Sequence, residues 1–170
     1  LLSFVGACTS TSLNVKPVGE SKNPTDQINR LENDIAAAYK NQLNVLAPTW
    51  FAKAESSLNQ AKKGLKQGEE LAEVLGNIAE GQAQLRKAEE ITRVTRTTMG
   101  DLIKSRNLAR QAGAAKLGYD YTDAEQQFLS LTKAIEKGNL AYAEKNKAAV
   151  SKTFHNLELR AIKTETLGEV

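Results

Sequence analysis

Residues 69–111 read EELAEVLGNIAEGQAQLRKAEEITRVTRTTMGDLIKSRNLARQ, and their hydrophobic pattern decides the fold. Apolar or small residues recur every seven positions in two interleaved rows: Leu71, Ile78, Leu85, Thr92 and Met99, and Val74, Gly81, Ala88, Thr95 and Leu102. A strict seven-residue repeat is the condition for left-handed supercoiled packing of helices. The stretch therefore predicts one continuous helix of about 43 residues, which would span roughly 65 Å. Gly81 and Ala88 predict that a neighbouring helix approaches closely at their positions.

Two shorter helices are predicted before this stretch. No proline follows Pro48, and proline costs about 3 kcal/mol in a helix interior, so long helices are permitted. The first helix starts near Pro24, with Thr25 or Asp26 as its N-cap, and runs to about Asn44 with a stripe of Ile28, Leu31, Ile35, Ala38, Gln42 and Val45. The second starts at Pro48 and is expected to bury Phe51, Ala54, Leu58, Ala61 and Leu65. Gly68 stands where a helix-ending glycine belongs.

Two more helices are predicted after a loop at residues 113–118. The fourth is expected to bury Tyr121, Ala124, Phe128, Leu131 and Ile135 and to end at Gly138. The fifth follows from Asn139 and carries a core stripe of Val150, Phe154, Leu157 and Ala161. A shift of 70 residues superimposes the second helix on the fourth, including Gly68 on Gly138. This offset indicates either an internal duplication or shared helical periodicity.

The predicted fold class is all-α. Residues 24–170 are expected to form an elongated antiparallel helical bundle with coiled-coil-like hairpins and tetratricopeptide-like helix–glycine–helix units. The helical pattern continues to Val170 without a closing proline or polar tail, so we expect the domain to be cut at its C-terminus.

The N-terminus has a different character. Residues 1–7 are apolar or small and resemble the latter part of a secretory signal peptide, here truncated. Cys8 is the only cysteine, and residues 8–23 are rich in Ser, Thr, Asn, Gly and Pro, a composition typical of a flexible tether. The alternative is a buried N-terminal strand that contains a packed free thiol.

Val5, Gly6, Ala7 and Cys8 together resemble the lipobox of bacterial lipoproteins. The resemblance implies that Cys8 is lipidated after cleavage of residues 1–7, and that the protein is held at the periplasmic face of the bacterial outer membrane, because Thr9 and Ser10 lack the aspartate that often marks inner-membrane retention. Lipidation suits a lone thiol, which is the most easily alkylated side-chain nucleophile.

The helical body resembles the Ala/Leu/Lys/Glu-rich domains of cell-envelope lipoproteins that precede OmpA-like peptidoglycan-binding domains. The resemblance is carried by Ala47-Pro48 with Ala54, Leu58, Ala61 and Gly68-Glu69, and by the ending Glu158-Leu159-Arg160-Ala161-Ile162-Lys163 with Leu167-Gly168-Glu169. It implies a peptidoglycan link through a downstream domain. No OmpA-like sequence occurs in these 170 residues, so no peptidoglycan-binding residue is assigned.

Composition and charge bear on two other function classes, nucleic-acid binding and membrane crossing. Twenty-three basic and twenty acidic residues leave a net charge of +3, which is too balanced for a dedicated nucleic-acid binder, and no stretch of about 20 apolar residues is present. Residues 86–116 nonetheless carry five net positive charges. On one continuous helix, Arg86, Arg93 and Lys104 would share a face, either as a surface for phosphates such as lipid headgroups or as an ordinary solvated face.

No catalytic residue, metal ligand or cofactor is predicted. His155 is the only histidine and has no ligand-spaced partner, so we expect it to flank the core stripe of the last helix. Trp50 is expected to anchor the bundle end or to line a binding pocket.

The sequence thus predicts a non-enzymatic lipoprotein whose helical domain is a spacer and docking platform. The alternative is a helical module that captures a peptide or hydrophobic ligand between its hairpins. An exposed groove at Trp50, Phe51 and Tyr121 would favour the alternative, and buried rings would favour the spacer. A long third helix that outreaches its neighbours would also leave a surface for a protein partner or for self-association.

Overall fold

The computed structural model describes residues 13–19 and 23–168. Within these ranges the chain forms α1 (Pro24–Lys40), α2 (Leu43–Leu46), α3 (Pro48–Gln67), α4 (Leu71–Thr98), α5 (Gly100–Gln111), the 3₁₀ helix η1 (Ala114–Leu117), α6 (Tyr119–Glu136) and α7 (Leu140–Gly168), with no strand in the described part. The predicted all-α class is confirmed. Cys8 and the lipobox residues Val5, Gly6 and Ala7 lie outside the described residues.

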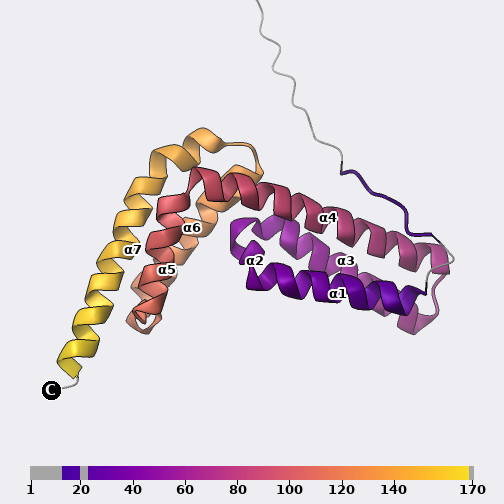
Figure 1. The fold of residues 1–170 in the computed structure, drawn as a ribbon, viewed down its shortest axis with the longest axis horizontal. Helices are drawn as coiled ribbons and strands as arrows, with labels where there is room; N and C mark the ends of the chain where they lie inside the picture. Colours follow the sequence, from indigo (N-terminus) through magenta and orange to yellow (C-terminus); the bar gives the residue numbers. More distant parts are fainter. Residues whose placement is uncertain (1–12, 20–22, 169–170) are drawn as a thin grey trace, which may run out of the picture.

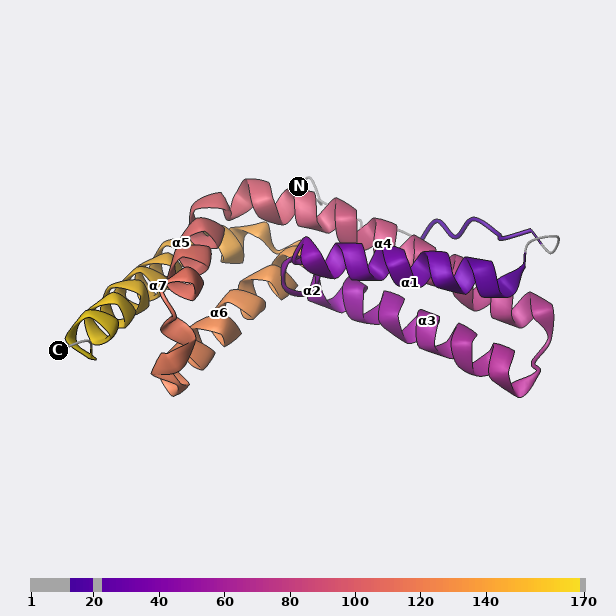
Figure 2. The same cartoon turned by 60° about the horizontal axis from the view of Figure 1, so that its bottom comes forward.

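The helices form two groups that meet at an angle (Figure 1). α1, α3 and α4 pack together in the N-terminal group, and α5 and α6 each pack against α7 in the C-terminal group. Figure 2, a view turned by 60°, shows the same elongated, bent arrangement. The short α2 lies at the junction, where it contacts α3, α4 and α6. We call this junction the elbow.

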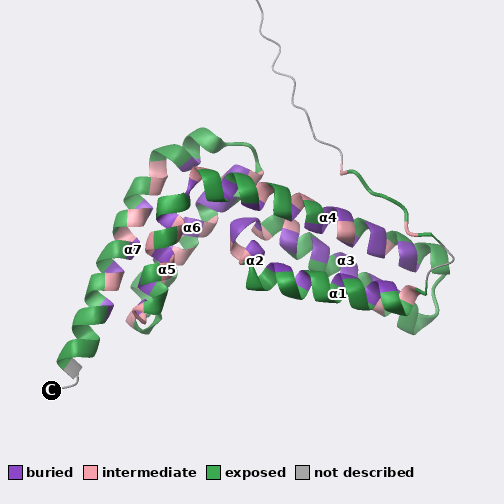
Figure 3. Cartoon of the chain, viewed as in Figure 1, coloured by how far each residue is buried: buried purple, intermediate pink, exposed green. Residues whose placement is uncertain are grey.

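Each group has its own hydrophobic core, seen as the buried faces that point inward in Figure 3. Ile28, Leu31, Phe51 and Ile78 belong to the N-terminal core, and Phe128 and Phe154 belong to the C-terminal core. Ile91 of α4 packs against both cores and so joins them. The two cores explain why one chain of this length makes an extended body instead of one compact bundle.

The predicted helix–glycine–helix hairpins are present twice, as α3–α4 and α6–α7. Gly68 and Gly138 both have a positive φ, of 71° and 78°, a region that glycine adopts without steric penalty. Each turn closes with the same two hydrogen bonds, in which the glycine N–H reaches back three residues and the next N–H reaches back five. Whether a duplication produced this repeat stays a prediction.

The first predicted helix ends earlier than expected. It stops at Lys40 and not near Asn44, because Gln42 adopts a left-handed conformation with φ of 64°. This turn reorients the following residues, so that Leu43 and Leu46 are buried where the stripe predicted Gln42 and Val45.

The continuous helix predicted for residues 69–111 is wrong, since it breaks between Thr98 and Gly100. Met99 has φ of −122° and ψ of 27°, outside helical values, and its side chain is buried at the elbow. The threonines before the break and the glycine after it have low helix propensity. A continuous helix through Met99 would therefore gain little stability from these residues. α5 consequently runs in another direction from α4 (Figure 1).

Most predicted core positions are buried, and besides Gln42 and Val45 the exceptions are three residues. Leu65 and Leu71, which flank the turn at Gly68, are 38% and 42% exposed. Tyr121 is only half-buried. The seven-residue rows otherwise hold across the helix break, because Thr92, Thr95, Met99 and Leu102 are all buried.

Gly81 and Gly76 of α4 provide a matched test of close helix packing. A Cβ on Gly81 would lie 2.8 Å from the buried Leu31 side chain and 3.3 Å from Ser57 Cβ, whereas a Cβ on Gly76 would meet nothing within 4 Å. We expect Gly76→Ala to raise the free energy of unfolding by about 1 kcal/mol through helix propensity. Gly81→Ala should lower it, because overpacking costs about 1–3 kcal/mol. Urea unfolding measures both, and equal effects would contradict the predicted close approach.

Candidate functional site

The three aromatic residues predicted as a binding surface do not come together. Phe51 is buried in the N-terminal core, with its ring centroid 6.3 Å from that of Tyr39. Trp50 is partly buried at the start of α3, and Lys53 Nζ lies 4.3 Å from the centre of its ring. Tyr121 belongs to the other helix group, where its ring meets that of Phe154 edge-on. These rings serve two separate cores.

The predicted basic face is only partly assembled. Arg86 and Arg93 are exposed on α4, and both line a groove of about 580 Å³ between α1 and α4. Lys104 lies on α5, beyond the helix break, and does not line the groove. Arg96 also lines this groove. It is not part of the predicted face, although its spacing of three from Arg93 could have indicated it.

The groove carries charges of both signs over a mixed floor. Arg86, Arg93 and Arg96 share it with the carboxylates of Asp34 and Glu89. The remaining lining residues are Ala37, Ala38, Asn41, Leu43, Gln82, Leu85 and Thr92. We call this feature the α1–α4 groove.

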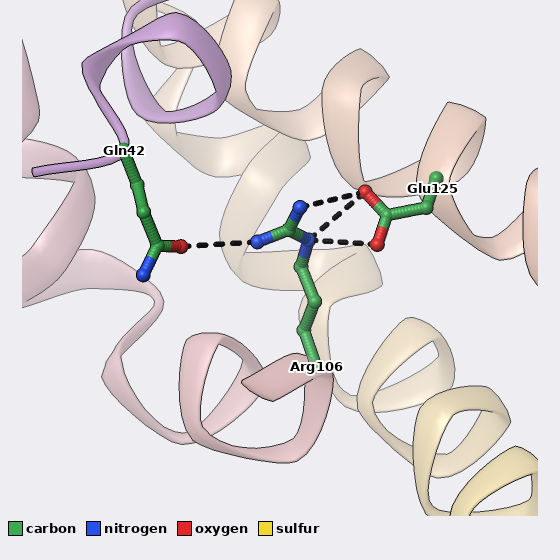
Figure 4. A network of polar contacts seen from close by, with 3 residues as sticks. All are labelled: Gln42, Arg106 and Glu125. Carbon is green, nitrogen blue, oxygen red and sulfur yellow. Dashed lines mark hydrogen bonds and ion pairs between the residues drawn. The ribbon is translucent and has the colours of Figure 1, made fainter. Parts of the chain in front are cut away.

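The elbow holds a buried ionic network that sequence reasoning did not predict. Arg106 of α5 donates three hydrogen bonds of 2.8–3.0 Å to the carboxylate of Glu125 on α6, and a fourth of 3.1 Å to Gln42 Oε1 (Figure 4). Its guanidinium also lies 4.9 Å from the centre of the Phe128 ring. The side chains of Arg106 and Glu125 are only 6% and 17% exposed, so the pair is largely desolvated.

Two helix ends at the elbow are completed by side chains from distant parts of the chain. The Glu136 carboxylate accepts hydrogen bonds from the N–H groups of Thr49 and Trp50 at the start of α3, where Ala47 offers no side-chain cap. Lys147 Nζ donates to the Thr98 carbonyl oxygen, at 2.8 Å, where α4 ends. Each charge has the sign that its helix end favours.

Tyr121 is the titratable residue that the elbow perturbs most clearly. Burial, together with the neighbouring Glu125 carboxylate, raises the pKa of Tyr121 to about 12 from an ordinary value of 10, against the opposing effect of Arg106 and Arg110. Burial and a nearby negative charge both disfavour the phenolate.

The described residues contain no group of three or more His, Cys, Asp or Glu side chains placed to hold a metal ion. His155 is 60% exposed, and its Nδ1 lies 3.4 Å from Glu158 on the same helix. The predicted core stripe beside it, from Val150 to Ala161, is buried as expected. In the ranges 13–19 and 23–168, no helix combines the length and apolarity that a membrane crossing needs.

The Arg106–Glu125 pair can be tested by double substitution. Glu125→Gln removes the charge that compensates a buried guanidinium, so the free energy of unfolding should fall by about 3 kcal/mol. The double variant Arg106→Met, Glu125→Leu removes both charges and keeps apolar volume, so its loss should be smaller than that of the single variant. Denaturant unfolding of the three chains measures the difference. A double variant that is less stable than the single one would show that this reading of the pair is wrong.

Tyr121 makes stability at high pH depend on one phenol. Because its pKa is raised in the folded state, its contribution is complete below pH 10 and is lost as the pH rises from 10 to about 12. Urea unfolding over this range should show a steeper loss for the native chain than for Tyr121→Phe. Tyr119→Phe is the matched control, since Tyr119 is 83% exposed, and it should behave like the native chain.

Comparison with known proteins places the chain in no group, since no family model, curated protein or solved structure matches it.

Proposed function

We propose that this chain is a non-enzymatic lipoprotein of the bacterial outer membrane, anchored through Cys8, whose helical domain acts in the periplasm as a spacer and docking platform. The observation that carries the proposal is the extended body of two helix groups behind a lipobox-like Val5-Gly6-Ala7-Cys8. Lipid attachment supplies the membrane affinity that an otherwise polar helical surface does not.

Residues 13–19, which we call the N-terminal strap, bear on how such an anchor would hold the domain. The strap runs along α4 (Figures 1 and 2). Val18 packs against the N-terminal core, and Leu13 lies with Trp50 and Gln84 at a shallow hollow between α3 and α4. Arg86 also donates a long hydrogen bond of 3.4 Å to the Asn14 carbonyl oxygen. The strap therefore takes up part of the length that a wholly free tether of residues 8–23 would have.

The remaining length limits the distance from the membrane. Cys8 and Leu13 are five residues apart in the sequence, so an extended chain between them covers at most about 18 Å. A lipid on Cys8 would accordingly hold α4 near the membrane surface. In this arrangement the strap side of the helical body would lie close to the outer membrane. The end of the body farthest from the strap would determine how far the protein extends into the periplasm.

That far end is α7. The helix has 29 residues and is about 43 Å long, and it carries the chain away from the elbow to the side opposite the strap (Figure 1). A peptidoglycan-binding domain joined after Val170 would start from this end. The bent body would then set the separation between the anchor and the wall.

The alternative function, capture of a peptide or hydrophobic ligand between the hairpins, receives less support. Phe51 is buried, and Trp50 and Tyr121 belong to different helix groups, so the predicted aromatic surface is not a continuous groove. The sequence predicts self-association from a long third helix that extends beyond its neighbours. That helix breaks at Met99, and α4 packs against α1 and α3, so this expectation is also less well supported.

The anchor is tested by Cys8→Ser in a bacterial host that processes lipoproteins, with every chain expressed behind a complete export signal, because residues 1–7 resemble only the latter part of one. We expect the native chain to incorporate an acyl label and to sediment with outer membranes. The Cys8→Ser chain should carry no label and appear in the periplasmic fraction. Ser10→Cys in the Cys8→Ser background is a matched control, since it moves the thiol out of the lipobox spacing and should not restore the label. Equal membrane sedimentation of the native and Cys8→Ser chains would contradict the proposal.

A further inference from the structure

We infer that the α1–α4 groove is a binding site for a phosphate group, held by Arg86 and Arg93. The inference goes beyond the spacer role, and its test does not depend on the anchor on Cys8. It rests on two features of the groove: arginines without carboxylate partners, and acidic side chains that limit the charge of the ligand.

The first feature is the incomplete pairing of the arginines. In the part of the chain that the structure describes, Arg86, Arg93 and Arg96 form no ion pair with a carboxylate. A guanidinium has five N–H donors. Arg86 donates one hydrogen bond to the Asn14 carbonyl oxygen, at 3.4 Å, and Arg96 donates one to the Asn41 carbonyl oxygen, at 2.9 Å.

Arg93 lies between them along α4, and its side chain makes no hydrogen bond within the described ranges. Arg106 at the elbow shows the contrasting case, because it makes four hydrogen bonds to side chains. The groove therefore presents free donors in the forked geometry that binds phosphate oxygens in pairs.

The second feature sets the chemistry of the ligand. Asp34 and Glu89 also line the groove, so the three arginines leave one net positive charge there. This balance suits a single phosphate group and disfavours polyanions such as nucleic acid, which need an extended positive surface. Two sources share this chemistry: a phospholipid headgroup, which α4 would meet near a membrane, and a soluble phosphate ester.

Calorimetric titration of the full chain carrying Cys8→Ser with inorganic phosphate tests the site without any anchor. We expect binding in the millimolar range, detectable at about 10 mM phosphate. Arg93→Gln should weaken the binding about tenfold, because it removes a charge-assisted bidentate contact. Lys104→Gln removes an equal charge outside the groove and should leave the affinity unchanged.

One further substitution tests the acidic side of the groove. Glu89→Gln should strengthen phosphate binding severalfold, since it removes a negative charge beside the ligand.

Vesicles that contain phosphatidylglycerol separate the two sources. Sedimentation of the Cys8→Ser chain with these vesicles, lost in Arg93→Gln and displaced by inorganic phosphate, would assign the site to a lipid headgroup. Binding of inorganic phosphate without sedimentation would assign it to a soluble phosphate ester.

The inference is overturned if the native groove binds neither phosphate nor vesicles, or if Arg93→Gln and Lys104→Gln have the same effect. These outcomes leave the lipid anchor untouched, because acylation of Cys8 is measured separately.

Discussion

The bent shape of this protein depends on the hydrogen bonds made by one buried guanidinium, that of Arg106. Arg106 joins the turn after α1, through Gln42, to α6, through Glu125, and it does so from α5 itself. A desolvated charge is costly unless all of its neighbours stay in place. The α4–α5 break, the left-handed turn at Gln42 and the position of α6 are therefore linked, and a change in one would leave a charge or a donor unpaired in the interior.

Helix termini strengthen the same junction. A helix end leaves backbone groups without partners, and at the elbow distant charged side chains supply them: Glu136 at the start of α3 and Lys147 at the end of α4. Both contacts connect the two helix groups, since each side chain belongs to the C-terminal group and each helix end to the N-terminal one. The bend is thus held by directional bonds as well as by the apolar contact of Ile91 with both cores.

The bend at the elbow is fixed by hydrogen bonds, whereas the α1–α4 groove contains polar groups without partners in the part of the chain that the structure describes, so the two regions suit different tasks. At the elbow, the charged side chains of Arg106, Glu136 and Lys147 all form hydrogen bonds with other parts of the protein, as a spacer of fixed shape requires. In the α1–α4 groove, by contrast, the Arg93 side chain forms no hydrogen bond within the described residues. Asn14 of the strap lies at the surface of α4, where Arg86 donates a hydrogen bond to its carbonyl oxygen. The proposed anchor and the proposed phosphate site would accordingly lie on the same helix.

The sequence by itself determined the helical class, the approximate helix boundaries, the glycine turns at Gly68 and Gly138, and most of the core. These depend on local backbone preference and on hydrophobic periodicity, and both are written along the chain. Only the tertiary structure decided the break at Met99, the burial of Arg106 and the grouping of Arg96 with Arg86 and Arg93. The seven-residue rows continue through the break, so periodicity could not reveal it, and the partners of Arg106 lie 19 and 64 residues away. Such contacts depend on which surfaces meet after folding, and that is settled by packing between distant segments and not by any local pattern.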